Sequence, residues 1–415
     1  MIGLVLAAGK GKRLKPFTET IPKPLLPVVD KPLVFYSLKL LQELGVEKVV
    51  VVVSHLKEIA VRGISEVCER LGLNPVFVYQ GEELGTGHAV AKALDHLDDD
   101  VVVVYGDLFI DDDARRRIRE FLEKGVKNVV CGAMVDDVSR YGKLVVDSGR
   151  VMDIVEKPNE KSPGLVNAGI YVFKHSVLEL VEQIPRSSRG EYELTDLIRI
   201  ARGKGEEFHL VELPRDSWID VGYPWMLLEV NKRVLEKIDR CVKGEVAPNV
   251  TIKGPVVIEE GAEIRSGTTI VGPSYVGPNA VIGPNAFIRP YTVIRSEAHI
   301  GFSVEVKESI VMERTHAAHL TYIGDSIIGR DVNFGAGTIT ANLRFDWKTI
   351  KVTIEGKRID SGRVKLGAFV GDNVKTGINV SIMPGVKIGH NSIIYPGVVV
   401  YRDVPPNTVV KEDWK

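Results

Sequence analysis

A six-residue spacing of apolar side chains constrains the fold of the second half of this 415-residue chain. The period returns after a gap in a second run of six positions. A hexapeptide period is typical of a parallel β-helix, in which three hexapeptides form one triangular coil. The repeating positions are Ile252, Ile258, Ile264, Ile270, Val276, Ile282, Ile288, Ile294, Ile300 and Val306, then Val370, Thr376, Ile382, Ile388, Ile394 and Val400.

An interrupted zone, residues 309–367, lies between these two runs. It contains the stretch AHLTYIGDSIIGRDVNFGAGTITAN, Ala318 to Asn342. Its polar content favours a role beyond that of a scaffold.

The first part of the chain follows a different pattern, in which β-rich apolar runs alternate with helical segments. The runs IGLVLAA, KVVVVVS, PVFVYQ and VVVVYGD are separated by helices expected near residues 33–44, 58–71 and before the last run. This alternation predicts a Rossmann-like, doubly wound and mainly parallel α/β sheet, whose ligand lies beyond the carboxyl ends of the strands. A helix is expected over Trp225–Arg240, followed by a Gly/Pro-bearing junction at Gly244–Pro248. We therefore predict three regions: a first domain at 1–235, a linker helix and junction at 236–248, and a β-helix at 249–415.

The charge balance limits the classes of partner. The chain has 54 Lys and Arg against 55 Asp and Glu, so no excess charge favours nucleic acid or an acidic membrane. We expect small-molecule substrates and copies of the same chain as partners. The start lacks the features of a signal peptide and no apolar run reaches about 18 residues, so we expect a cytoplasmic protein. Cys68, Cys131 and Cys241 have no CxxC spacing and predict buried or idle thiols.

The first strand ends in a loop rich in glycine and cations, LAAGKGKRLKPFTETIPKPLLPV from Leu6 to Val28. A dinucleotide fingerprint would need glycine where Leu14 stands, and a Walker A loop would need Gly-Lys-Ser/Thr. Gly9 and Gly11 allow backbone N–H groups to approach an anion, with lysines and Arg13 around it. Taken alone, the loop also fits a tight basic turn.

Further motifs follow in a fixed order: PKPLLPV with Lys23, YQGEELGTGHA at 79–89, YGD at 105–107, VEKP at 155–158, NAGIY at 167–171 and WIDVG at 218–222. In this order they resemble the sugar-1-phosphate nucleotidylyltransferases over residues 1 to about 235. The resemblance implies the nucleotide-diphospho-sugar transferase fold. It also implies a reaction in which a sugar-1-phosphate oxygen attacks the α-phosphorus of a nucleoside triphosphate, releases pyrophosphate and leaves an NDP-sugar.

Such a reaction brings two anions together, and like unit charges at about 4 Å repel by roughly 4 kcal/mol at an effective dielectric of 20. Cations are therefore required: Arg13 can fork onto the triphosphate and Lys23 can bridge both reactants. By resemblance, Asp107 and Asp220 are the Mg²⁺ ligands, a donor set that this ion accepts. Asn231 is a rival metal partner, but its helical context predicts a surface amide.

The resemblance also implies the remaining residues of the first site, and with them a pyrimidine nucleotide, UTP or dTTP. Gln80 can donate to O4 and accept from N3–H of uracil or thymine. Glu156 would bind sugar hydroxyls and Lys157 the sugar phosphate, although a strand-end ion pair is an alternative for these two. The nucleotide-binding set is Leu6, Ala7, Ala8, Gly9, Gln80, Gly85, Thr86, Tyr105 and Gly106, and the sugar-phosphate set is Gly142, Glu156, Lys157 and Asn167.

The stretch Ala318–Asn342 resembles the acetyltransferase half of the bifunctional N-acetylglucosamine-1-phosphate uridyltransferases. That family implies a left-handed β-helix that trimerises, with acyl sites between subunits. His319 would be the general base toward acetyl-CoA, a role that its near-neutral pKa suits. The resemblance further implies phosphate contacts from Arg289 and Lys307, sugar contacts from Tyr322, Asn333 and Asn342, and an oxyanion contact from the backbone N–H near Ala336.

Two departures alter the wall expected for coenzyme A. Leu343 stands where the bacterial pattern has tyrosine after the asparagine, and Asp372 stands where it has serine. Lys348 and Lys351 are candidates for compensating contacts to coenzyme A phosphates, and a solvated charged loop is the alternative.

The sequence thus predicts a bifunctional enzyme with Mg²⁺ as cofactor and UTP or dTTP and acetyl-CoA as co-substrates. Its first domain would act on N-acetylglucosamine-1-phosphate or glucose-1-phosphate, and its second would N-acetylate glucosamine-1-phosphate. One alternative is a monofunctional glucose-1-phosphate thymidylyltransferase with a purely structural β-helix. Another is an inactive regulatory or scaffold subunit.

Overall fold

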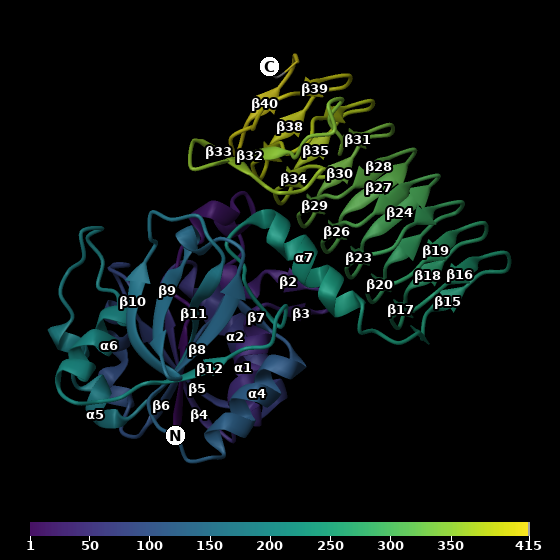
Figure 1. Cartoon of the computed structure of the whole chain (residues 1–415). Coiled ribbons are helices and arrows are strands. Elements are labelled where there is room, and N and C mark those ends of the chain that lie inside the picture. Colours follow the sequence, from purple (N-terminus) through teal and green to yellow (C-terminus); the bar gives the residue numbers. More distant parts are fainter. Residues whose placement is uncertain (414–415) are drawn as a thin grey trace. The chain divides into compact units, whose positions relative to one another are not determined.

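The computed structural model describes residues 1–413 (Figure 1). The chain divides into two compact units. The first comprises Met1–Lys10, Pro22–Leu26 and Pro32–Val221, and the second comprises Gly11–Ile21, Pro27–Lys31 and Gly222–Lys415.

The first unit is built on a nine-stranded mixed sheet with the order β5-β4-β1-β6-β11-β8-β12-β10-β9. β1, β4, β5 and β6 run parallel, whereas β11 is antiparallel to both β6 and β8. The valines of β4 and β6 are fully buried, as expected for central strands covered on both faces. The strands are β1 (Ile2–Leu6), β4 (Lys48–Val53), β5 (Asn74–Tyr79), β6 (Val101–Tyr105), β8 (Val129–Val135), β9 (Gly142–Asp147), β10 (Arg150–Glu156), β11 (Gly164–Phe173) and β12 (His209–Glu212).

Helices cover both faces of this sheet, so the doubly wound architecture predicted from the sequence is confirmed (Figure 1). One face packs against α1 (Val34–Glu43), α2 (Lys57–Leu71) and α4 (Asp112–Leu122). The other packs against α3 (Thr86–Ala93), α5 (His175–Leu178) and α6 (Leu194–Gly203). The short 3-10 helices are η1 (Lys12–Leu14), η2 (Phe17–Glu19), η3 (Lys23–Leu25), η4 (Leu94–His96), η5 (Val138–Arg140) and η6 (Val181–Gln183).

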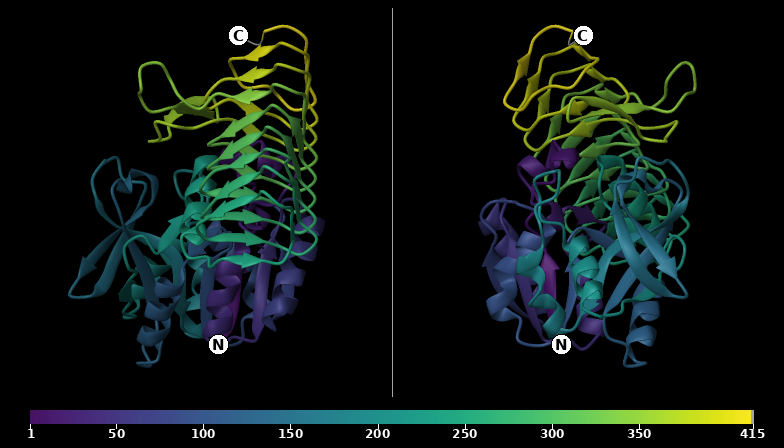
Figure 2. Two further views of the ribbon diagram at one scale, coloured as in Figure 1. Left: turned by 90° about the vertical axis from the view of Figure 1, so that its right-hand side faces the viewer. Right: turned by 60° about the vertical axis from the view of Figure 1, so that its left-hand side comes forward.

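The second unit contains a left-handed parallel β-helix of three sheets (Figure 2). The six-residue period predicts the parallel β-helix, and the family resemblance implies its left hand. The first sheet comprises β14 (Cys241–Val242), β17 (Val256–Ile258), β20 (Ser274–Val276), β23 (Thr292–Ile294), β26 (Ile310–Val311), β29 (Ile327–Ile328), β34 (Phe369–Val370) and β37 (Lys387–Ile388). The second comprises β15 (Glu245–Val246), β18 (Glu263–Ile264), β21 (Val281–Ile282), β24 (His299–Phe302), β27 (His316–His319), β30 (Asn333–Phe334), β35 (Lys375–Thr376), β38 (Ile393–Ile394) and β40 (Val409–Val410). The third comprises β16 (Thr251–Lys253), β19 (Thr269–Val271), β22 (Phe287–Ile288), β25 (Glu305–Lys307), β28 (Tyr322–Gly324), β31 (Ile339–Thr340), β36 (Ser381–Ile382) and β39 (Val399–Val400).

The β-helix continues through most of the zone that lacks the six-residue period in the sequence. Ile300 of β24 pairs with Ala317 of β27, and Val311 pairs with Ile328. The period is lost because Val311 follows Val306 by five residues, and Ile328 follows Ile323 by five. A side chain therefore still faces the core at each position, and the description of residues 309–367 as an interruption of the scaffold was largely wrong.

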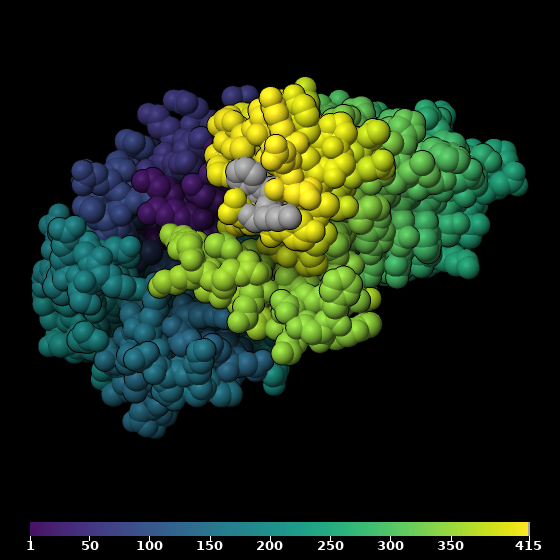
Figure 3. Space-filling model, turned by 90° about the horizontal axis from the view of Figure 1, so that it is seen from above, coloured from purple at the N-terminus to yellow at the C-terminus, as the bar shows by residue number. Residues whose placement is uncertain are grey.

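One antiparallel hairpin within that zone leaves the coils, β32 (Lys351–Ile354) with β33 (Lys357–Asp360). It protrudes from the stack of coils (Figure 2) and forms part of the molecular surface (Figure 3). Just before it, Phe345 is fully exposed and Trp347 is largely exposed.

Helix α7 (Pro224–Leu235) is shorter than the predicted segment Trp225–Arg240. β14 and β15 fall within the predicted linker and junction region at 236–248 and already pair with the next coil. The expectation of a surface amide at Asn231 was wrong, because its side chain is buried. Its Oδ1 accepts from the N–H of Val29 at 2.7 Å, and its Nδ2 donates to the carbonyl of Leu227 at 2.7 Å. Asn231 thus fastens the short β2 (Pro27–Val28), which pairs with β3 (Lys31–Pro32), to α7.

Among residues 1–413, no helix combines the length and apolar character needed to cross a membrane. Cys68 and Cys131 are buried, as expected, and Cys241 is exposed. Burial raises the pKa of the Cys68 thiol to about 11 and that of Cys131 further. Both buried cysteines therefore remain protonated thiols at neutral pH.

Two candidate active sites

The first candidate site centres on the ammonium group of Lys23. This side chain is buried, and its Nζ forms an ion pair with Asp107 Oδ2. The same Nζ lies 3.8 Å from Asp220 Oδ1. The structure therefore brings together three of the residues that the sequence analysis selected for catalysis.

Local pairing explains why the two carboxylates meet. Asp107 follows β6 and precedes β7 (Leu108–Ile110), and Asp220 ends β13 (Trp218–Asp220). β7 and β13 form a two-stranded antiparallel sheet in which Asp220 is opposite Leu108. The N–H of Val221 also donates to the carbonyl of Asp107 at 3.3 Å.

Arg13, the fourth residue of that group, belongs to the second unit. Its guanidinium lies 5.2 Å from the ring centroid of Tyr223, a cation–π contact. The turn before it favours glycine, because Gly11 has φ of 61°. The carbonyl of Gly11 accepts from Thr18 Oγ1 at 2.8 Å.

The side chain expected to contact the nucleobase, Gln80, is held by hydrogen bonds of its amide. Gln80 is buried, and its Nε2 donates to the carbonyl of Gly85 at 3.0 Å and lies 3.2 Å from His88 Nδ1. Burial lowers the pKa of His88, so this imidazole is neutral and can accept. Both hydrogens of the Gln80 amide are thus engaged within the chain, and its Oε1 is the atom left to contact a base.

Gly85 and Thr86 shape the start of α3. Gly85 has φ of 106°, and a Cβ there would lie 2.6 Å from the carbonyl oxygen of Tyr192. Thr86 Oγ1 accepts from the N–H of Leu194 at 3.0 Å, which fixes α3 to the start of α6. At the neighbouring strand ends, the N–H of Gly106 donates to the carbonyl of Leu6 at 2.9 Å and that of Ala7 to Val52 at 2.9 Å. Ala8 is buried, and Gly9 is exposed with open space where a Cβ would stand.

Glu156 lies at the end of β10 in a partly buried acidic environment. Thr195 donates to its Oε1 at 3.1 Å, and the guanidinium of Arg189 lies 3.7 Å from its Oε2. Burial, followed by the nearby carboxylate of Glu193, raises the pKa of Glu156. A Cβ at position 142 would lie 3.0 Å from Glu156 Oε1, so the glycine there makes room for the carboxylate.

Two further residues of the sugar-phosphate set have unusual backbone or side-chain settings. Lys157 has φ of 44°, a conformation that costs a non-glycine residue free energy and is enriched at functional sites. Asn167 Nδ2 donates to the Tyr171 hydroxyl at 2.5 Å, and its Oδ1 accepts from the N–H of Gly169 at 3.0 Å. The hydroxyls of Tyr171 and Tyr105 lie 3.3 Å apart. These hydrogen bonds fix the orientation of the Asn167 side chain.

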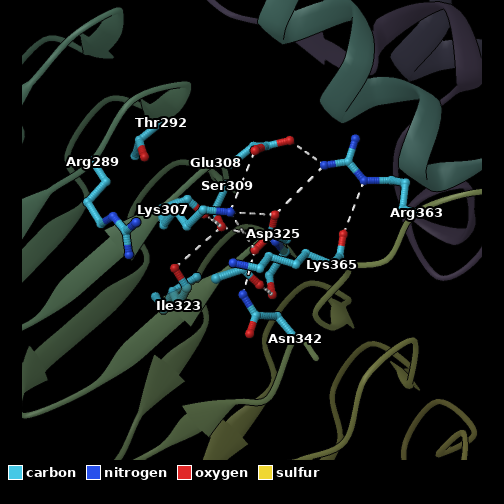
Figure 4. Close-up of polar contacts among 12 residues, drawn as sticks. Arg289, Thr292, Lys307, Glu308, Ser309, Ile323, Asp325, Asn342, Arg363 and Lys365 are labelled. Carbon is cyan, nitrogen blue, oxygen red and sulfur yellow. Dashed lines mark hydrogen bonds and ion pairs between the residues drawn. The ribbon is translucent and has the colours of Figure 1, made fainter. Parts of the chain in front are cut away.

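The second candidate site lies on the third sheet of the β-helix and centres on Lys307 (Figure 4). Its Nζ donates to both oxygens of Asp325, at 2.8 and 3.0 Å, and lies 3.6 Å from Glu308. Arg363 forms ion pairs with Glu308 and, at 3.8 Å, with Asp325. The side chain of Asp325 is only 1% exposed.

Asn342 joins the same network from the coil that follows. Its Nδ2 donates to Asp325 Oδ2 at 2.6 Å and to the Tyr322 hydroxyl at 3.0 Å. Burial and the neighbouring carboxylates of Asp325 and Glu305 raise the pKa of Tyr322, so its phenol keeps its proton. The structure thus brings together Lys307, Tyr322 and Asn342, as the sequence analysis predicts.

The other residues of this site are less enclosed. Arg289 lies 2.9 Å from Glu305 in a half-exposed ion pair. His319 is exposed at the end of β27, and Asn333 is exposed in β30. The carbonyl of Ala336 accepts from the N–H of Asn379 at 2.8 Å, and the N–H of Gly337 donates to the carbonyl of His319 at 3.4 Å.

Asp325, Glu308 and Arg363 were missed by the sequence analysis. A signal for Asp325 exists, because Lys307 and Asp325 are separated by one coil and both lie at the end of a strand of the same sheet or just after it. Arg363 lies beyond the hairpin, where the repeat gives no register. Asp372, expected in the coenzyme A wall, is instead buried and accepts from Arg330 Nε and Thr20 Oγ1, each at 2.8 Å.

Comparison with known proteins identifies similar families for each part of the chain. Residues 2–237 match the family described as Nucleotidyl transferase. Residues 270–360 match the GMPPB C-terminal domain, and residues 367–402 match Bacterial transferase hexapeptide (six repeats).

Three curated relatives match over almost the whole length. A protein of Sulfurisphaera tokodaii named Bifunctional sugar-1-phosphate nucleotidylyltransferase/acetyltransferase is 44% identical over 97% of this chain and 98% of its own. A Bifunctional protein GlmU of Methanocaldococcus jannaschii is 43% identical over 99% of this chain and 97% of its own. One of the same name from Bartonella quintana is 31% identical over 98% and 93%.

We predict that Glu156→Gln changes stability with a definite pH dependence. The folded chain raises the pKa of Glu156 above its ordinary value of 4.5, so the stabilisation from this group is present below that value and is lost as pH rises through the folded value. Glutamine is neutral throughout. The free energy of unfolding of the variant relative to wild type should therefore increase as pH rises through this range, as measured by urea unfolding at a series of pH values.

Glu160→Gln is the matched control with the opposite sign. Hydrogen bonds from Ser162 and Lys143 lower the pKa of Glu160, so its removal should cost stability as pH rises. If the free energy of unfolding relative to wild type changed with pH by the same slope in both variants, the assignment of Glu156 as a desolvated carboxylate would be contradicted.

Proposed function

Because the chain belongs to the family of bifunctional sugar-1-phosphate nucleotidylyltransferase/acetyltransferases, we propose which residues perform each of its two reactions. Residues 1–235 transfer a nucleotidyl group to a sugar-1-phosphate. Residues 249–415 form the acetyltransferase domain, and residues 236–248, whose strands β14 and β15 begin the stack of coils, join the two. The observation that carries the first assignment is the buried ammonium of Lys23 between Asp107 and Asp220.

In the first reaction, an oxygen of the sugar phosphate forms a bond to the α-phosphorus while the bond to the departing pyrophosphate breaks. Lys23 offers a compact positive charge to the phosphate groups of both reactants, and Arg13 offers a forked one to the triphosphate. No covalent intermediate with the chain is required, because alignment and charge neutralisation lower the barrier.

Asp107 and Asp220 would hold Mg²⁺, which when bound neutralises phosphate charge. The residues present fit this ion, because magnesium is commonly held by one or two carboxylates together with substrate phosphates. Within residues 1–413, no cluster of three or more His, Cys, Asp or Glu side chains could hold a metal by itself. The phosphates and water must therefore supply the other ligands.

The base specificity follows from the engaged amide of Gln80. Since its Nε2 hydrogens point to Gly85 and His88, its Oε1 accepts from the base. The N3–H of uracil or thymine is such a donor, so UTP and dTTP both fit. Glu156 accepts hydrogen bonds from hydroxyls of the sugar, which is N-acetylglucosamine or glucose, and Lys157 binds its phosphate.

In the second reaction, the amine of glucosamine-1-phosphate attacks the thioester carbon of acetyl-CoA. A C–N bond forms and the C–S bond breaks, His319 takes the proton from the amine, and the protonated imidazole returns it to the departing thiolate of coenzyme A. Arg289 and Lys307 bind the phosphate of the acceptor, and Tyr322, Asn333 and Asn342 place its sugar. The N–H at Ala336 contacts the oxyanion.

The chain acts as a homo-oligomer, and we propose a trimer assembled through the β-helix. The full exposure of Phe345 and the large exposure of Trp347 support a partner surface, since large apolar side chains beside each other at a loop mark sites of association. The cytoplasm is the proposed site of action, because nucleoside triphosphates and acetyl-CoA are available there.

Asp107→Ala is expected to lower Mg²⁺-dependent release of pyrophosphate by about 100-fold or more, because it removes a metal ligand and the partner of Lys23. The assay supplies UTP or dTTP with each sugar-1-phosphate. Asp113→Ala, on the surface of α4, should leave turnover unchanged. Unchanged turnover of Asp107→Ala would reject the metal assignment.

His319→Ala is expected to lower acetyl transfer to glucosamine-1-phosphate by about 100-fold or more, because the general base is lost. Release of free coenzyme A thiol measures this activity. His316→Ala removes another exposed imidazole of β27 and is the matched control. A wild-type chain that releases pyrophosphate but no thiol would favour the monofunctional alternative with a structural β-helix.

A further inference from the structure

We propose that Asp325 is a positioning residue. It determines which atoms of the acetyl-acceptor site donate hydrogen bonds to the substrate and which accept them. This inference rests on the proposed acetyltransferase function. Asp325 does not itself reach the substrate, because its side chain is only 1% exposed. It acts through Lys307 and Asn342, which donate hydrogen bonds to it (Figure 4). Through Asn342 it also acts on Tyr322, whose hydroxyl accepts from the same amide.

The polar groups that contact the Asp325 carboxylate are hydrogen-bond donors. Its Oδ1 receives Lys307 at 2.8 Å and lies 3.8 Å from Arg363. Its Oδ2 receives Lys307 at 3.0 Å and Asn342 at 2.6 Å. An ionised carboxylate only accepts, so it suits this environment, whereas an amide would turn an NH₂ group against one of these donors.

The contact with Asn342 fixes the orientation of its amide. Both hydrogens of Nδ2 are engaged, one by Asp325 Oδ2 and one by the Tyr322 hydroxyl. Oδ1 of Asn342 is therefore the atom available to accept from a substrate hydroxyl or amine. The Tyr322 hydroxyl accepts from Asn342, so its own proton is available for a substrate oxygen.

The contact with Lys307 fixes the direction of its ammonium group. Two of its three hydrogens point to Asp325, and the remaining contact within reach is Glu308 at 3.6 Å. Arg363 restrains Glu308 by an ion pair of its own. Asp325 therefore prevents Lys307 from turning fully toward Glu308 and keeps it available for the phosphate of the acceptor.

Two effects of removing the Asp325 charge oppose each other. Loss of a buried negative charge near a phosphate would by itself favour the anion, whereas loss of position would disfavour it. A charge-assisted hydrogen bond depends steeply on geometry, so we expect position to dominate. The sign of the change in KM then separates the two effects.

The test is Asp325→Asn, measured as KM for glucosamine-1-phosphate, KM for acetyl-CoA and kcat. We expect KM for glucosamine-1-phosphate to rise by about tenfold or more, the factor of one charge-assisted hydrogen bond, with KM for acetyl-CoA unchanged. The substitution should add less on a Lys307→Met background than on wild type, because both act on one contact. An unchanged KM for acetyl-CoA reports that the β-helix is folded, and pyrophosphate release by the same preparations reports that the first unit is folded.

Asp331→Asn is a matched control. Asp331 also has a left-handed backbone, φ 56° against 50° at Asp325, and also pairs with a cation of the preceding coil, Arg314, but its side chain is 40% exposed. It should leave every constant unchanged.

A double variant that exchanges the two side chains tests the order of donor and acceptor even if Asp325→Asn alone folds poorly. Asp325→Asn with Asn342→Asp keeps one carboxylate and one amide but reverses their order, so it should not restore KM. Rescue by the swap, or an unchanged or lower KM in Asp325→Asn, would overturn the proposal. If wild type transfers no acetyl group to glucosamine-1-phosphate, the proposed function fails instead.

Discussion

A lysine ammonium group held by carboxylates is the interaction on which both candidate sites depend. Lys23 pairs with Asp107 and lies near Asp220, and Lys307 pairs with both oxygens of Asp325. Burying a lone ammonium is costly, and removing one partner of a buried pair typically costs about 3–5 kcal/mol. The carboxylates therefore compensate the charge of each lysine and fix the direction of its ammonium group. In the proposed function, both units use such a pair to present a cation to a sugar phosphate.

Backbone regularity places these groups in both units. In the mixed sheet, Asp107 follows β6, and the pairing of β7 with β13 brings Asp220 beside it. In the β-helix, the parallel register places Gly324, which precedes Asp325, beside Lys307. At strand ends and coil corners, pairing with neighbouring strands fixes the backbone. The side chains there lie beside the apolar core, so polar groups can be held in fixed positions. This rigidity is what a phosphate-binding site needs.

The sequence predicts the architecture well, because apolar periodicity is a direct consequence of burial. The six-residue period specifies the β-helix, and the valine runs specify the central strands, so that Asp107 is correctly expected at a strand end. The prediction from apolar periodicity fails where the spacing is shortened by a single residue. The five-residue step to Val311 hid the continuation of the coils, although the register itself persists.

Other features depend on contacts between distant segments and could not be read from spacing. Asn231 is buried by β2, which lies about 200 residues earlier in the chain. Arg363 reaches Glu308 from beyond a hairpin that has no repeat. The role of Asp372 depends on Thr20, far away in sequence. Each is a long-range polar pair, and hydrophobic periodicity carries no information about these.

The most direct test of a lysine–carboxylate pair in each site is to measure pyrophosphate release and acetyl transfer on the same preparations of wild type, Lys23→Ala and Lys307→Ala. The account predicts a crossover: Lys23→Ala loses the first activity and keeps the second, and Lys307→Ala does the reverse. Loss of both activities in either folded variant, or full retention of the activity assigned to the substituted lysine, would contradict it.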